Sequence, residues 1–340
     1  MKYVTFGKSG LRVSELSLGT MTFGDQYNWG ASNDESKKIF DAYITAGGNF
    51  IDTANFYSTG GSESLLAGFI KDIRKQLVIA TKYTYTMNLK DPNAGGSHRK
   101  NMVQSVEESL KRLKTDYIDI FWVHAYDPYT PIDEVLRGLD DLVRQGKVLY
   151  IGFSDAPSWI VSASQVMAEL RGWTSFTGVQ VEYNLIERTV ERDLLPMAKH
   201  FNLAVTAWSP LASGLLSGKY NSKDTPANEK RLSLAAFKQV SERNLAIADK
   251  VIEVAKQIGR SPSQVALNWL RQQHASIIPI VGARKFSQFE DNLKALEFEL
   301  SPEHLAILSQ SSEIELGFPH DHLNATHGLI KGDVELTRVY

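Results

Sequence analysis

Residues 117–153 read YIDIFWVHAYDPYTPIDEVLRGLDDLVRQGKVLYIGF, a stretch that contains one strand, one helix and a second strand. The apolar run Tyr117–Val123 predicts the first strand, and Val148–Phe153 predicts the second. A helix is predicted over Ile132–Gln145, because Pro131 precedes it and Gly146 follows it, as helix start and stop signals do. Elements in this order indicate two parallel strands joined by a crossover.

The same alternation continues in both directions along the chain. Further strands are predicted at Leu16–Leu18, Asn49–Ile51, Leu77–Thr81, Gly178–Val181, Ala204–Ala207 and Ser276–Ile280. Further helices are predicted at Asp34–Ala46 (with Asn33 as N-cap), Arg99–Leu113, Pro157–Leu170, Val190–His200, Ser241–Ile258 and Phe286–Ala295. Eight strands that alternate with helices predict an α/β protein with a closed (β/α)8 TIM barrel.

Segments outside this strand–helix alternation predict further structure around the barrel. Lys2–Thr5 and Leu11–Val13 flank Gly7-Lys8-Ser9-Gly10 and predict an N-terminal β-hairpin outside it. Long loops are predicted over Lys82–His98 and Ser209–Ala236, and long loops in a compact domain are usually functional or disordered. We expect one domain over residues 1–340, with a C-terminal tail from about residue 313.

Composition excludes several classes of protein. The 340 residues carry a formal net charge of −2 with scattered Lys and Arg, so nothing indicates a nucleic-acid partner or an anionic membrane surface. The chain has no cysteine, which excludes disulfides, thiol nucleophiles and Cys-bound metals. Because the first residues lack the apolar segment of a signal peptide, and no apolar run could span a bilayer, we expect a cytoplasmic protein. The oligomeric state is left open by these patterns.

Polar residues follow three consecutive predicted strands at the points where the strands end. Asp52, Lys82 and His124 each come directly after an apolar run, and Tyr57 lies in the loop after Asp52. Reactive groups of a TIM barrel come from the C-terminal ends of different strands. We therefore expect these four side chains to meet at one mouth of the barrel.

These four residue types form an acid–base set. A tyrosine is a weak acid with an ordinary pKa of about 10, and a nearby ammonium such as Lys82 is expected to lower that pKa. Asp52 would keep Lys82 charged, His124 would donate a hydrogen bond to a carbonyl oxygen, and Tyr57 would give that oxygen a proton. Taken singly, each residue has a structural alternative, as an ion pair at the barrel rim, a packed aromatic or a core histidine.

The usual nucleotide-binding loops are absent. No two glycines are separated by a single residue, so Gly-x-Gly-x-x-Gly does not occur, and GLLSGK at 214–219 is one residue too short for a P-loop. His320, His322 and His327 offer metal ligands, but their place in a polar tail favours solvated side chains, so no metal is expected.

Two segments at the end of the predicted barrel can bind phosphate instead. WSPLASG at 208–214 follows the seventh strand, and PIVGARK at 279–285 follows the eighth and leads into a helix, whose N-terminus attracts anions. Gly282 permits close approach of the backbone. Arg284 and Lys285 supply two charges, which favours a cofactor with an extra 2′-phosphate, NADPH rather than NADH; the alternative is a surface pair on a first helical turn.

These motifs together resemble the aldo-keto reductase superfamily over nearly the whole chain. The segments that carry the resemblance are Asp52–Tyr57, Ala80–Lys82, Tyr117–Asp119 leading to His124, Gly146–Val148, Ile151–Ser154, Gln180–Asn184, Trp208–Leu211 and Gly282–Arg284. The resemblance implies an oxidoreductase that reduces aldehydes or ketones with NADPH, with Asp52, Tyr57, Lys82 and His124 as its catalytic tetrad.

The resemblance also implies where the cofactor lies. Ser154 and Gln180 would hold the carboxamide, and Trp208 would stack on the nicotinamide ring. The other implied contacts are Gly19, Thr20 and Met21 at the ribose, Leu211, Gly214 and Lys219 at the pyrophosphate, Arg284, Gln288 and Asn292 at the adenosine 2′-phosphate and adenine, and Asp52, Asp155, Ser209, Pro210, Leu216 and Gly282 elsewhere along it.

One departure from the family pattern is Asp155, because much of the family has Asn there and an Asp cannot donate to the carboxamide oxygen. SDAPSW at 154–159 is similar to the branch that contains aryl-alcohol dehydrogenases, which favours medium-sized aromatic aldehydes as substrates. The candidate substrate wall consists of Phe23, Trp29, Phe56, Tyr57, Tyr83, Tyr85, His124 and Tyr126.

Two other functions remain open at this point. The chain could be a nucleotide-sensing binding protein with slow turnover, since the barrel also resembles the β-subunits of voltage-gated potassium channels. It could also be a phosphate-binding aldolase with Lys82 as a Schiff-base lysine. The favoured partner is a small-molecule carbonyl substrate.

Overall fold

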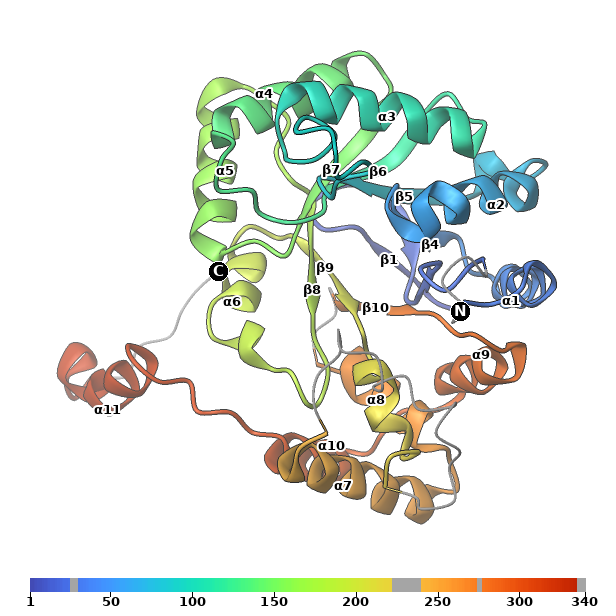
Figure 1. Ribbon diagram of the computed structural model, residues 1–340. Helices are drawn as coiled ribbons and strands as arrows, with labels where there is room; N and C mark the ends of the chain where they lie inside the picture. Colours follow the sequence, from blue (N-terminus) through green and yellow to red (C-terminus); the bar gives the residue numbers. More distant parts are fainter. Residues whose placement is uncertain (25–29, 222–239, 274–276, 335–340) are drawn as a thin grey trace.

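A closed barrel of eight parallel strands forms the centre of the protein (Figure 1). The computed structural model describes residues 1–24, 30–221, 240–273 and 277–334. The barrel strands are β3 (Ser17–Gly19), β4 (Phe50–Asp52), β5 (Val78–Tyr83), β6 (Ile118–Val123), β7 (Val148–Ser154), β8 (Gly178–Glu182), β9 (Ala204–Trp208) and β10 (Ile277–Val281). They follow one another around the barrel in chain order, and β10 pairs with β3 to close it. The predicted TIM barrel is confirmed.

Helices surround this barrel on its outside. They are α1 (Asn33–Thr45), α2 (Gly61–Ile70), α3 (Arg99–Leu113), α4 (Ile132–Arg144), α5 (Ser158–Arg171), α6 (Leu194–His200), α7 (Glu242–Ile258), α8 (Pro262–Arg271), α9 (Phe286–Leu293), α10 (Pro302–Ser311) and α11 (His320–Lys331). Two predictions are wrong in detail. Ser32, rather than Asn33, caps α1 by accepting from the Glu35 amide at 3.3 Å. The predicted helix Val190–His200 is interrupted, because its first turn is a separate 3₁₀ turn, Thr189–Glu191.

Four of these helices, α2, α8, α10 and α11, are absent from the sequence predictions. Helix α2 starts in the glycine-rich segment Gly60–Gly61, which hides its pattern because glycine disfavours helix. Helices α8 and α10 each begin with a serine N-cap followed by proline, at Ser261 and Ser301. That pair is a helix start signal, so both helices could have been found in the sequence.

The N-terminal hairpin closes the bottom of the barrel. Strands β1 (Tyr3–Thr5) and β2 (Arg12–Ser14) pair antiparallel, as predicted. Phe6 is fully buried and packs edge-on against Phe50 and Trp122 inside the barrel, with ring centroids 5.7 and 6.2 Å apart. With this end filled, access to the interior is left to the opposite end, where the strands have their C-termini.

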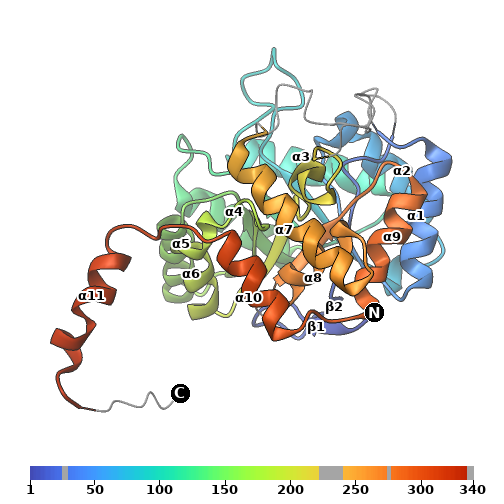
Figure 2. The ribbon, with the colours of Figure 1, turned by 90° about the horizontal axis from the view of Figure 1, so that it is seen from below.

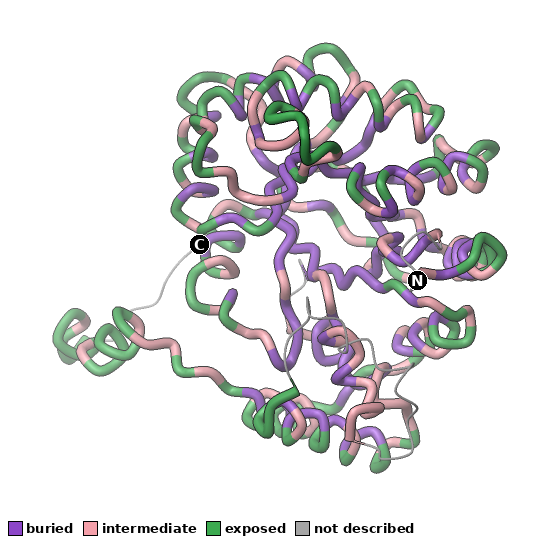
Figure 3. The backbone as a smooth tube through the Cα atoms, viewed as in Figure 1, coloured by how far each residue is buried: buried purple, intermediate pink, exposed green. Residues whose placement is uncertain are grey.

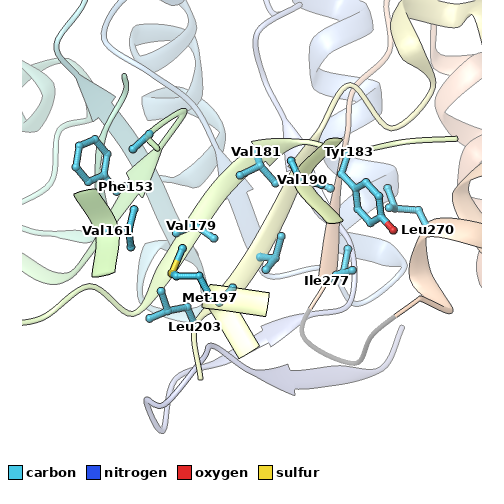
Figure 4. Packing of buried hydrophobic residues seen from close by; sticks show 14 of the residues in the cluster. Phe153, Val161, Val179, Val181, Tyr183, Val190, Met197, Leu203, Leu270 and Ile277 are labelled. Atoms are coloured by element: carbon cyan, nitrogen blue, oxygen red, sulfur yellow. The ribbon is translucent and has the colours of Figure 1, made fainter. Parts of the chain in front are cut away.

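The hydrophobic core lies mainly between the barrel and its helices. Figure 3 shows the strands almost continuously buried, whereas the outer faces of the helices are exposed. Figure 4 shows part of this layer, in which Val179 of β8 lies near Met197 and Leu203, and Val181 lies near Val190. A smaller cluster, which includes Phe50, Ala80 and Trp122, fills the barrel interior.

The tail after Ser312 contains a helix that the sequence did not predict. Helix α11 stands apart from the barrel in both ribbon views (Figures 1 and 2), and none of its residues is buried. Among the described residues, no helix combines the length and the apolar character needed to cross a membrane.

Candidate active site

Three barrel strands direct polar side chains into the same mouth. Successive side chains of a strand point to opposite faces, so residues two apart share a face. Phe50 and Ala80 line the barrel interior, and Asp52 and Lys82 lie two residues beyond them on the same face. His124 likewise lies two residues beyond the interior residue Trp122. The strand alternation therefore aims all three polar groups inward.

Lys82 is the centre of a buried hydrogen-bond network. Its side chain is 0% exposed, and its ammonium forms a short ion pair with the Asp52 carboxylate. The same nitrogen donates to the Thr53 carbonyl at 2.8 Å and to the Tyr57 hydroxyl at 3.2 Å. The second oxygen of Asp52 accepts from Nε2 of Gln180 at 2.9 Å. Lys82 thus lies between a carboxylate and a phenol, and its neighbours fix its position.

The loop that carries Tyr57 is held by side-chain hydrogen bonds. Ser58 and Thr59 adopt left-handed backbone conformations, with φ of 49° and 51°. The Ser58 hydroxyl donates to the Phe23 carbonyl at 3.1 Å, and the Ser62 hydroxyl donates to the Thr20 carbonyl at 2.9 Å. These bonds tie the loop to the segment after β3 and fix the direction in which Tyr57 points.

Burial decides the protonation of this cluster. Burial raises the pKa of Tyr57 above its ordinary value of 10, and the opposing effect of the Lys82 charge does not outweigh it. The expectation that Lys82 lowers the pKa of Tyr57 below 10 is therefore wrong for the protein alone. Burial also acts to lower the pKa of Lys82, but Asp52 and Tyr57 outweigh it, so this pKa is raised. At neutral pH, Tyr57 is a neutral phenol and Lys82 an ammonium.

His124 is the neutral member of the group. Burial, together with the Lys82 charge, holds the pKa of His124 well below its ordinary value of 6.5. Its ring lies 6.0 Å from the Tyr57 ring, centroid to centroid, and 4.3 Å from that of Tyr85. A neutral imidazole has one N–H, so His124 can donate a hydrogen bond without bringing a charge.

One long cavity of about 730 Å³ joins these side chains to the last two barrel strands. Many of the sequence-predicted residues line it. They are Gly19, Met21, Asp52, Phe56, Tyr57, Tyr85, His124, Ser154, Asp155, Gln180, Trp208, Ser209, Pro210, Leu211, Gly214, Lys219, Gly282, Arg284, Gln288 and Asn292. Lys82 is not among them, because it is buried against Asp52.

Other predicted residues lie outside this cavity wall. Phe23 is fully buried in the core, edge-on to Phe69 at 6.4 Å, so it cannot form a substrate wall. Tyr83 alternates with Lys82 along β5, faces outward and stacks on Phe121 at 5.0 Å. Tyr126 is partly buried and packs against the core.

Two residues predicted to contact the cofactor are also absent from the wall. Leu216 is buried in the core, and the Thr20 hydroxyl is buried against the Asp52 carbonyl at 3.1 Å. Nearby residues of the chain, Gly214 and Met21, do line the cavity. Trp29 and most of Ser209–Ala236 lie outside the described residues.

The cavity also has four lining residues that the sequence did not indicate, Thr22, Ser217, Ser263 and Asp291. Ser213, Ile280, Val281 and Ala283 also line it and lie within the two predicted phosphate-binding segments. Ser263 lies at the start of α8, so recognising that helix would have found it. Asp291 is held by the Ser261 hydroxyl and by Gln264, each at 2.6 Å. Among the described residues, no group of three or more His, Cys, Asp or Glu could hold a metal ion.

The two ends of the cavity differ in chemistry. One end combines the Asp52–Lys82–Tyr57 network and His124 with the amide of Gln180 and the indole of Trp208. The other end has the cations Lys219 and Arg284 with polar side chains of α9. Between them Gly19 and Gly282 lie so close that a Cβ at Gly282 would be 2.9 Å from the Gly19 carbonyl oxygen.

A TIM barrel with a buried phenol–ammonium pair at one end of a cavity and cations at the other suits an oxidoreductase that binds a phosphate-bearing cofactor. The chain belongs to the aldo/keto reductase family, whose model matches residues 15–313. The predicted family is confirmed, and the chain is a carbonyl-reducing oxidoreductase.

Three curated relatives of the chain are named as reductases or dehydrogenases. The chain is 37% identical over 331 residues to an aryl-alcohol dehydrogenase [NADP(+)] of Phanerodontia chrysosporium, covering 92% of this chain and 86% of the relative. It is 37% identical over 322 residues to a norsolorinic acid reductase of Emericella nidulans, covering 92% and 81%. It is 35% identical over 331 residues to an aldo-keto reductase of Aspergillus calidoustus, covering 92% and 82%.

Proposed function

We propose that this protein reduces aldehydes and ketones to alcohols with NADPH, and that Tyr57 is the proton donor. The observation that carries the proposal is the contact between the Lys82 ammonium and the Tyr57 hydroxyl, 3.2 Å apart at the inner end of the cavity. A phenol gives up its proton more readily when the resulting phenolate is stabilised by an adjacent cation. The relative named as an NADP(+) enzyme supports the choice of cofactor.

The donor set of the cavity suits an extended dinucleotide. Gln180 and Ser154 offer hydrogen bonds to a carboxamide, and the Trp208 indole offers a flat surface for a nicotinamide ring. Lys219 and Arg284 offer positive charge for phosphates at the far end. When bound, the cofactor would supply a hydride to the carbonyl carbon.

Each side chain at the inner end has a separate role in proton transfer. Tyr57 transfers its hydroxyl proton to the carbonyl oxygen as negative charge develops there. Lys82 stabilises the phenolate that remains, and Asp52 keeps Lys82 charged and in place. His124 is neutral and donates a hydrogen bond to the same oxygen, which polarises the carbonyl before the proton moves.

The same features disfavour an aldolase. A Schiff-base lysine must lose its proton to attack a carbonyl, which requires a lowered pKa. The pKa of Lys82 is raised instead, and its nitrogen donates to three oxygens. A binding protein with slow turnover differs from an enzyme in rate alone, so steady-state rates with several aldehydes distinguish the two.

Removal of Arg284 is expected to weaken NADPH selectively. Charged hydrogen bonds contribute about 1.5–3 kcal/mol, so Arg284→Ala should raise the Kd for NADPH by roughly tenfold to a hundredfold. The Kd for NADH, which lacks the 2′-phosphate, should change little. Fluorescence titration with both cofactors measures this. Lys285→Ala is the matched control, since Lys285 is the adjacent cation but does not line the cavity. Equal losses for NADPH and NADH would remove Arg284 from this role.

Aromatic aldehydes are the expected substrate class. Phe56 and Tyr85 pack edge-on with centroids 5.6 Å apart, and Tyr85 lies beside His124. This aromatic wall would contact a flat ring whose carbonyl points at Tyr57. A panel of nitrobenzaldehydes, aliphatic aldehydes and sugars tests it, and we expect the highest kcat/KM with nitrobenzaldehydes. Turnover of sugars or small aliphatic aldehydes alone would contradict this substrate class.

A further inference from the structure

The backbone fixes Asp155 at the inner end of the cavity. This residue follows β7 directly and adopts a left-handed conformation with φ of 45°. Its amide donates to the Gln180 carbonyl at 3.1 Å, and its carbonyl accepts from the Tyr126 amide at 3.3 Å. These two hydrogen bonds fix the main chain of Asp155, and with it the position from which the carboxylate extends into the cavity.

The Asp155 carboxylate accepts a hydrogen bond from Trp208. The indole N–H of Trp208 donates to Oδ1 of Asp155 at 3.0 Å. Both residues line the cavity together with Ser154 and Gln180. Under the proposed function, on which this inference rests, the Trp208 indole stacks on the nicotinamide ring. A negative charge would then lie beside that ring.

The two redox forms of a nicotinamide differ in charge at this position. The oxidised ring is a pyridinium cation, whereas the reduced ring is neutral. A nearby carboxylate attracts the cation and has little effect on the neutral ring. We propose that Asp155 determines the redox preference of the cofactor site, because its carboxylate, held by the Trp208 N–H, favours NADP⁺ over NADPH.

The titration of Asp155 makes this preference dependent on pH. The Asp155 side chain is exposed at the open mouth, but the surrounding protein partly desolvates its carboxylate and raises its pKa to about 6, although the Trp208 N–H and the Lys82 charge act to lower it. The other titratable groups around this mouth, within the described chain, are Asp52, Tyr57, Tyr85, His124 and Glu182. Tyr57 and Tyr85 have raised pKa values and His124 a lowered one, so these three stay neutral near pH 6. Glu182 repels the Asp155 charge and contributes to raising its pKa.

The sign of the pH effect follows from this pKa. Above about pH 6 the carboxylate is charged and attracts the oxidised ring; below it, Asp155 is neutral and the attraction is lost. The affinity for NADP⁺ should therefore rise with pH relative to the affinity for NADPH. A 2′-phosphate also titrates near pH 6, but both cofactor forms carry it. The ratio of the two Kd values cancels that contribution and reports on the ring.

The test compares the wild-type protein with Asp155→Asn, which keeps an oxygen to accept from Trp208 and removes the charge. We would titrate both proteins with NADP⁺ and with NADPH between about pH 5 and pH 8. In the wild type, the ratio of the Kd for NADP⁺ to that for NADPH should fall about tenfold across this range. In Asp155→Asn the ratio should stay flat at its low-pH value. Asp133→Asn removes an exposed carboxylate of α4 and should behave as the wild type.

An NMR readout without cofactor follows the ionisation of Asp155 independently of cofactor binding. The indole N–H signal of Trp208, assigned by its loss in Trp208→Phe, should titrate near pH 6 in the wild type and not in Asp155→Asn. If the Kd ratio is equally flat in the wild type and Asp155→Asn, the redox role of Asp155 is overturned and the cofactor proposal stands. If the wild type binds neither cofactor, both are overturned, whatever the NMR titration shows.

Discussion

Tyr57→Phe is expected to bind NADPH with near-normal affinity and to lose between about a hundredfold and ten-thousandfold in kcat, the range that a general acid contributes. The variant keeps the aromatic ring and loses only the hydroxyl oxygen, which in the wild type accepts a hydrogen bond from Lys82 at 3.2 Å. Because the hydroxyl is neutral in the protein, no charge is left unpaired, and folding should be little affected. Steady-state kinetics with a nitrobenzaldehyde, together with NADPH titration, measure both quantities.

Tyr85→Phe provides the matched control for this variant. It removes the same chemical group from another tyrosine in the same cavity, one that lies beside His124. We expect its kcat to change by less than about tenfold, since Tyr85 does not hydrogen-bond to Lys82 and transfers no proton in the proposed mechanism. Normal turnover in Tyr57→Phe, or an equal loss in both variants, would remove Tyr57 from its role as proton donor.

Lys82→Met should affect both turnover and stability. The substitution leaves the Asp52 carboxylate buried with Gln180 as its remaining side-chain donor, and breaking a buried ion pair in this way costs about 3–5 kcal/mol of unfolding free energy. It also removes the cation that stabilises the Tyr57 phenolate, so kcat should fall at least a hundredfold. Urea unfolding and steady-state kinetics give the two values.

A double variant separates these two effects. In Asp52→Asn/Lys82→Met the unpaired charge is removed, so much of the lost stability should return. Turnover should not return, because the ammonium beside Tyr57 is still missing. Recovery of turnover together with stability would mean that Lys82 serves the fold alone and has no part in proton transfer.

The barrel could be predicted from the sequence because each of its strands is a short apolar run. Residues 117–153 show the pattern clearly, and the strands at Ile118–Val123 and Val148–Ser154 lie within one residue of the prediction. Helix ends were found where a cap or a break marks them, as at Pro131 before α4. Helix α2 was missed because its glycines weaken the helical pattern. The organisation as a single domain with a C-terminal tail stays a prediction.

The polar side chains at the mouth could be predicted because strand alternation fixes their direction. Asp52, Lys82 and His124 end apolar runs, and each lies on the inward face. Aromatic residues could not be placed in the same way. Phe23 and Tyr83 differ from Phe56 and Tyr85 in packing rather than in residue type, and only the three-dimensional contacts distinguish a core ring from a cavity wall.

The pKa of Tyr57 shows a second limit of sequence reasoning. The presence of Lys82 predicted a lowered pKa, but the extent of burial, which the sequence does not give, reverses the direction. The proposed mechanism needs a neutral phenol before the reaction and a stabilised phenolate after it. Burial provides the first and Lys82 the second, so the correction strengthens the assignment of Tyr57 as an acid.

A crystal structure of the complex with NADP⁺ tests the central claim most directly. We predict that the nicotinamide stacks on Trp208 with its carboxamide at Gln180, that the reacting face of the ring is turned toward the Tyr57 hydroxyl, and that the 2′-phosphate contacts Arg284. A cofactor bound with its nicotinamide far from Tyr57 and Lys82, or in the reverse direction along the cavity, would contradict the proposed mechanism.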